Sequence, residues 1–61
     1  MEAVVDLLRA SQAEQTPVVV YFRSGRLDGV VTRLDETTVE LRGDRTRSVI
    51  RLSEIDAVTT G

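Results

Sequence analysis

Residues 17–41 read PVVVYFRSGRLDGVVTRLDETTVEL, and this stretch decides the fold. The first of three short runs is rich in β-branched and aromatic residues, and in the third run apolar residues alternate with polar ones, both of which are typical of β-strands. Ser-Gly and Asp-Glu pairs separate the runs, and glycine supplies the positive φ that a tight turn requires. Gly29 lies inside the second run, where a glycine often marks a bulge or a sharp bend at which another backbone approaches. We predict strands at residues 18–23, 26–34 and 37–42, folded into a small, strongly bent barrel.

The flanking segments complete the predicted architecture. Val4, Leu7 and Leu8 follow the i, i+3, i+4 spacing of an amphipathic helix, which we predict over residues 1–13 as a lid on one end of the barrel. A hairpin turn at residues 43–45 leads to further predicted strands at residues 47–52 and 55–59. The predicted fold class is therefore mainly β. It consists of one domain over residues 1–61, with an N-terminal helix and a five-stranded antiparallel SH3-like barrel in residues 17–59.

The chain is short for an independent domain. A domain of about 60 residues buries only ~60% of the surface that its unfolded chain exposes, and such domains are usually supported by disulfides, metals or oligomerisation. The sequence contains no Cys and no His, which excludes disulfides and removes the usual ligands of a transition metal. We expect no cofactor and no metal. Oligomerisation remains, and a ring of identical copies would cover the exposed strand edges.

Charge and composition restrict the function. Eight arginines and ten acids give a net charge of −2, and residues 1–17 carry all of it, with three acids against one arginine. A nucleic-acid binder with a broad electrostatic footprint has a basic excess, so any RNA binding here must depend on local pockets. Without a thiol, an imidazole or a lysine, no nucleophile–base pair is available, and we expect no enzyme activity. The sequence shows neither a membrane span nor a signal peptide, which predicts a cytoplasmic protein.

Three segments resemble the Hfq branch of the Sm-like superfamily. Residues 17–25 (PVVVYFRSG) are similar to the family's Pro-Val-x-Ile-Tyr-Leu-x-Asn-Gly opening. Residues 26–29 (RLDG), followed by Leu34-Asp35, are similar to its Lys-Leu-x-Gly stretch and Phe-Asp element, with one residue fewer in the preceding turn. Residues 55–58 (IDAV) are similar to the closing Ile-Ser-x-Val strand. With the N-terminal helix, the resemblance spans nearly the whole chain.

The resemblance implies a homo-oligomeric ring, usually a hexamer, in which the fourth strand of one subunit pairs with the fifth strand of the next. It also implies binding of A-rich single-stranded RNA on the face away from the helices. Tyr21 matches the family's stacking tyrosine there, and Gly25, Arg26 and Leu27 match the residues beside it. Arg23 and Arg26 bracket the turn next to Tyr21, which makes both candidates for phosphate contact. Asp28 stands where the family has Gln, and Asp56-Ala57 replaces Ser-Thr.

The family's other RNA sites are altered in this chain. At the positions of its uridine pocket stand Glu36, Thr37, Leu52 and Ser53, with neither an aromatic ring nor a cation. On the helix, Gln12, Ala13 and Gln15 replace rim arginines, and Arg9 alone lies near. We therefore expect A-rich strands to bind better than U-rich ones.

Alternatives remain for the single residues and for the whole chain. Arg45 and Arg47 flank the hairpin turn and could contact phosphates, although pairing with Asp44 or Glu40 is the simpler interpretation. Asp35 is expected to brace a turn through its side-chain oxygen. The preferred function is an RNA chaperone or post-transcriptional regulator, with no membrane partner and no small-molecule substrate. The alternatives are a ring with degenerate RNA pockets that serves as a structural or protein-interaction module, and a monomeric SH3-like adaptor.

Overall fold

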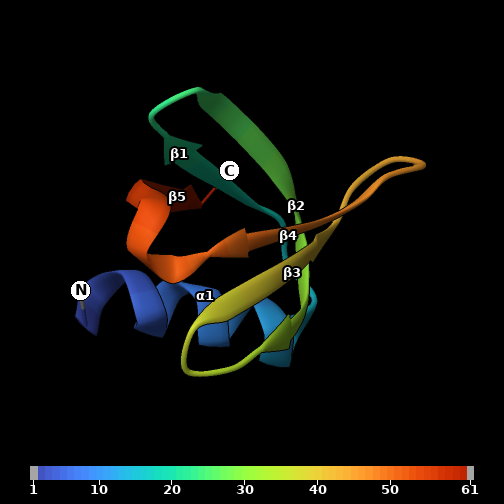
Figure 1. The fold of residues 1–61 in the computed structure, drawn as a ribbon. Coiled ribbons are helices and arrows are strands. Elements are labelled where there is room, and N and C mark those ends of the chain that lie inside the picture. The colour runs from blue at the N-terminus through green and yellow to red at the C-terminus, as the bar shows by residue number, and fades with distance from the viewer. Residues whose placement is uncertain (1, 61) are drawn as a thin grey trace.

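The computed structural model describes residues 2–60 and confirms the predicted architecture, a helix followed by five antiparallel strands (Figure 1). Each predicted boundary among these residues lies within one residue of the observed one, and the predicted helix start at Met1 lies outside them. Leu52, predicted to end a strand, instead begins a 3-10 turn. The elements are α1 (Glu2–Glu14), β1 (Val18–Phe22), β2 (Gly25–Leu34), β3 (Thr38–Arg42), β4 (Arg47–Arg51), η1 (Leu52–Glu54) and β5 (Ile55–Thr60).

Helix α1 covers one end of the barrel with its apolar stripe, as expected (Figure 1). Leu8 is fully buried, and Val4 and Leu7 pack against the same core. The helix ends at Glu14, and the φ of 57° at the following residue, Gln15, lets Thr16 N–H donate back to the Ser11 carbonyl oxygen at 3.2 Å. Within residues 2–60, no helix is both long enough and apolar enough to cross a membrane.

The five strands form one sheet in the order β4-β3-β2-β1-β5, bent along β2. The first half of β2 pairs with β1 up to Gly29, and the second half pairs with β3 from Val30 onward. A Cβ on Gly29 would lie 2.6 Å from the Arg42 carbonyl oxygen, so the predicted close approach of a second backbone at this glycine is confirmed. The irregularity in strand register falls further along, between Val31 and Arg33, and not at Gly29.

The core lies between the two halves of the bent sheet and α1. Alternation along the strands places one set of side chains inward, as the sequence pattern predicts for Val18 and Val20 on β1 and for Val39 and Leu41 on β3. Phe22, which the same alternation would place on the inner face of β1, is only partly buried and packs at the margin of the core. The buried core residues are Leu8, Val18, Val20, Val31, Val39, Leu41, Ile55 and Val58.

The two edges of the sheet are β4 and β5, each paired on one side only in the described chain. Unpaired N–H and C=O groups on such edges favour pairing with another chain. Val49, in the middle of β4, is 65% exposed, so an apolar side chain faces solvent on this edge of the protomer. The protomer therefore leaves open the two edges that a ring would join.

Candidate nucleic-acid interface

Tyr21 lies on the outer face of the sheet and is partly open to solvent. It pairs with Arg26 on β2 and with Ala57 on β5, and its side chain is 36% exposed. Antiparallel partners point to the same face, so the phenol ring stands between a guanidinium and a small methyl group. An exposed aromatic ring beside a cation is the arrangement on which single-stranded bases stack.

The predicted site residues surround the turn between β1 and β2, at the end of the barrel away from α1 (Figure 1). Gly25 pairs with Phe22 and has a φ of 153°, a conformation that side-chain-bearing residues rarely adopt, so its role in the turn is conformational. Leu27 pairs with the buried Val20 and packs against the core, so its side chain faces away from the side of Tyr21. Of these paired residues, Tyr21 and Arg26 are therefore the ones whose side chains lie on this face of the sheet.

Arg23 lies in acidic surroundings. It lines a depression of about 320 Å³ together with Ser53, Glu54 and Asp56. Asp56 occupies an irregularity in the sheet, because Tyr21 pairs with Ala57 while Phe22 pairs with Ile55. The two carboxylates compete with any phosphate for the Arg23 guanidinium, which weakens its claim to an RNA contact.

The face around Tyr21 carries balanced charge. Asp28 stands two residues after Arg26 on the same side of β2 and is exposed. Its cross-strand partner is Val19, which pairs in turn with Thr59 on β5. A strand of RNA would therefore find one cation, one anion and one aromatic ring here, with no broad positive field.

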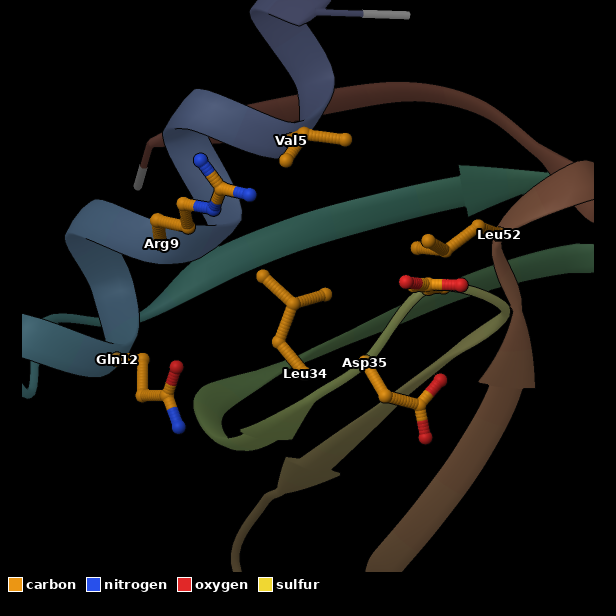
Figure 2. Close-up of a pocket in the computed structure, with 7 residues that line it drawn as sticks. Val5, Arg9, Gln12, Leu34, Asp35 and Leu52 are labelled. Carbon is orange, nitrogen blue, oxygen red and sulfur yellow. The ribbon is translucent and has the colours of Figure 1, made fainter.

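On the helix side, a groove of about 550 Å³ runs between α1 and the end of β2. Figure 2 shows Val5, Arg9 and Gln12 on the helix, across the groove from Leu34 and Asp35, with Leu52 at one end. Glu36 also lines it, so the lining contains one arginine and two acidic residues. This composition disfavours a polyanion in the groove.

The residues at the family's uridine-pocket positions do come together. Glu36, Thr37, Leu52 and Ser53 line a neighbouring depression of about 370 Å³, joined by Thr38 and Arg51. Arg51 is a cation that the motif comparison missed, because it precedes the matched positions and enters the depression from β4. The depression still lacks an aromatic ring.

Asp35 braces the turn between β2 and β3, which confirms the prediction for this residue. Its Oδ1 accepts hydrogen bonds from Thr37 N–H and Thr38 N–H, both at 2.8 Å, and its Oδ2 accepts one from the Thr38 hydroxyl at 3.0 Å. These bonds, the backbone bond from Thr37 first, lower the pKa of Asp35 from 3.8 to about 2. The carboxylate is occupied by its own turn. Across residues 2–60, no group of three or more acidic side chains is placed to hold a metal ion.

An N-terminal helix followed by a bent five-stranded antiparallel sheet of this order is the Sm-like fold. A solved structure of the pleiotropic translational regulator Hfq matches the chain with a TM-score of 0.83 and 28% sequence identity, over 92% of this chain and 86% of that one. No protein-family model matches the sequence, and no curated protein is similar enough in sequence to count as a match. The chain therefore has the Hfq-like form of the Sm-like fold with a divergent sequence, which confirms the resemblance found from its motifs.

Proposed function

We propose that this chain assembles into a homo-oligomeric ring, a hexamer by analogy with Hfq, and binds A-rich single-stranded RNA on the face that carries Tyr21. Its role would be that of a cytoplasmic RNA chaperone or post-transcriptional regulator without enzyme activity. The observation that carries the proposal is the exposed Tyr21 ring beside Arg26 on an open sheet face of an Hfq-like fold. The matched structure is that of a translational regulator, which supports the same class of function.

Ring assembly is supported by the two open edges of the sheet. In a ring, β4 of one copy pairs with β5 of the next, and the exposed Val49 of β4 gains a cross-strand neighbour. Such a contact is heterologous, and it closes when the rotation between copies divides a full turn. It also supplies the burial that a 61-residue chain lacks on its own.

The proposed preference for A-rich RNA follows from a comparison of the side chains at the Tyr21 face with those at the uridine-pocket positions. Tyr21 and Arg26 offer stacking and a cation on one face, whereas the described residues of the uridine-pocket depression include no aromatic ring. Stacking on an aromatic side chain contributes about 1–3 kcal/mol per base. Purines have the larger stacking surface, so the Tyr21 face should favour them.

One observation favours the second candidate, a ring that serves as a structural or protein-interaction module. Asp28 and Asp56 lie at or beside the Tyr21 face, where they repel phosphate. If these acids dominate, the face would bind a basic protein segment instead of RNA.

Two measurements test the proposal together. Native mass spectrometry at micromolar concentration should show a closed oligomer, and fluorescence anisotropy should show tighter binding of oligoadenylate than of oligouridylate. A monomer would contradict the ring. A closed ring with no affinity for either RNA would leave the interaction module as the function.

A further inference from the structure

The β3–β4 hairpin concentrates the positive charge of the chain. Residues 38–51 contain four arginines and two acids, a charge of +2, whereas the rest of the chain contains four arginines and eight acids, a charge of −4. In Figure 1 the turn of this hairpin projects beyond the rest of the barrel. The hairpin is thus a locally basic, accessible element on an acidic protein.

Three of these arginines surround one depression at the hairpin tip. Arg42 and Arg47 are direct cross-strand partners, and Arg45 lies in the turn between them. With Gly43 and Thr46, they line a hollow of about 320 Å³ to which residues 2–60 contribute no carboxylate, although Asp44 belongs to the same turn. The three other depressions described above each include at least one acid.

This arrangement opposes the stability of the isolated protein. Like charges directly opposite each other on a sheet are destabilising, and Arg42 and Arg47 are both exposed and directly opposed. Arg45 also has a φ of 70°, in the left-handed region that residues other than Gly, Asn and Asp seldom occupy. Gly43 N–H holds the turn by donating to the Thr46 carbonyl oxygen at 2.9 Å. An anion in the hollow would relieve the repulsion between the two guanidinium groups.

The hairpin tip adjoins the Tyr21 face through β2. A Cβ on Gly43 would lie 3.1 Å from the Asp28 carbonyl oxygen, so the base of the turn touches β2 two residues beyond Arg26. Two strand residues span about 7 Å, which is the separation of Arg26 and Asp28 along β2. Along β2, Asp28 follows Arg26 and lies at the base of the hairpin turn, so phosphates are expected on either side of it.

We propose that Arg42, Arg45 and Arg47 form a second anion site, which binds phosphodiester groups of the RNA strand whose bases stack on Tyr21. This rests on the proposed function and adds a second backbone contact to the single cation, Arg26, beside Tyr21. A guanidinium presents paired N–H donors that match two phosphate oxygens. Three guanidinium groups around one hollow therefore favour the binding of a phosphate group in it. The site explains how a chain of net charge −2 holds a polyanion.

The test compares two double variants that change the net charge equally. Arg42→Gln/Arg47→Gln removes the opposed pair, and Arg9→Gln/Arg33→Gln removes two arginines outside the hollow. Anisotropy titrations with labelled oligoadenylate are run between about 0.05 and 0.2 M salt, because each phosphate contact to a single strand contributes about 0.7 to the slope of log K against log salt. The hairpin variant should bind about tenfold more weakly with a slope smaller by about 1.4, while the control stays within about threefold of the wild type with its slope unchanged.

Thermal unfolding without RNA shows whether the variants fold, and the hairpin variant should unfold no earlier than the wild type. Equal losses of affinity in both double variants would reduce the effect to net charge and overturn the site. A hairpin variant that binds like the wild type would overturn it as well.

If Tyr21→Ala weakens binding and the hairpin variant does not, this inference fails while the proposed function stands. If only the hairpin variant weakens binding, the Tyr21 face fails instead, and a wild type that binds no RNA overturns both.

Discussion

The Ser11 hydroxyl of α1 joins the helix to β2 through Val31. Its oxygen accepts a hydrogen bond from Val31 N–H at 3.1 Å, and the hydroxyl donates to the Thr16 carbonyl oxygen at 2.5 Å. Ser11 is 1% exposed and is the buried polar residue among the described side chains. Val31 lies beyond the last β1–β2 pair, at Gly29, and a helix side chain accepts from its N–H there, which fixes how α1 lies across the barrel.

We predict that Ser11→Ala lowers the free energy of unfolding by about 1–3 kcal/mol, because it leaves the buried Val31 N–H without an acceptor. Alanine is the better helix former, so the measured loss underestimates the hydrogen-bond contribution. Ser53→Ala, at an exposed serine in η1, is the matched control and should change stability by no more than about 0.5 kcal/mol. Urea denaturation of the two variants would contradict the prediction if their midpoints were equal.

Tyr21→Ala should weaken binding of oligoadenylate by about tenfold or more, since it removes one stacking surface. Tyr21→Phe keeps the ring and removes only the hydroxyl, so it should retain most of the affinity. Native mass spectrometry of both variants checks that the assembly is unchanged. An unaltered titration for Tyr21→Ala in an intact oligomer would argue for the protein-interaction module instead.

Val49→Asp should shift the assembly toward monomers. The side chain is 65% exposed on edge strand β4, so the substitution leaves the protomer core intact but places a charge where the next copy would pair. Ala13→Asp, at an exposed position of α1, introduces the same charge away from both edges. Native mass spectrometry over a dilution series should separate the two variants. Identical oligomer distributions would place the interface elsewhere.

Most of the fold could be predicted from the sequence because its signals are local. The two-residue period of a strand puts Val18 and Val20 together on the inner face of β1, and Gly25 sets the turn that follows. The sequence places Gly29 at a contact with a second backbone, but it cannot say which backbone, because that depends on the bend of β2.

The site could be predicted only in part, because it depends on contacts between segments far apart in the chain. Motif matching identifies Tyr21 and Arg26 correctly as neighbours, but it cannot show that Leu27 turns toward the core or that Arg23 lies beside Glu54. The pairing of Arg42 with Arg47 depends on the register of β3 and β4, which the sequence does not specify. Their shared hollow therefore emerges only from the structure.

Asp35→Asn should remove an acid-dependent part of the stability. The folded state lowers the pKa of Asp35 from 3.8 to about 2, so the unfolded chain binds the proton first as the pH falls. The stabilisation is therefore complete above about pH 4 and is lost between about pH 4 and pH 2. At fixed protein concentration, urea midpoints of wild type and Asp35→Asn should differ most near neutral pH and converge toward pH 2.

The companion variant Thr38→Val separates the donors that hold this carboxylate. It removes the hydroxyl that donates to Oδ2 but keeps the Thr37 and Thr38 N–H groups, which are the larger causes of the lowered pKa. Most of the pH dependence should therefore remain in Thr38→Val and be absent in Asp35→Asn. If Asp35→Asn kept the same acid sensitivity as the wild type, another carboxylate would carry it, and the Asp35 turn would stabilise the fold without a pH-dependent part.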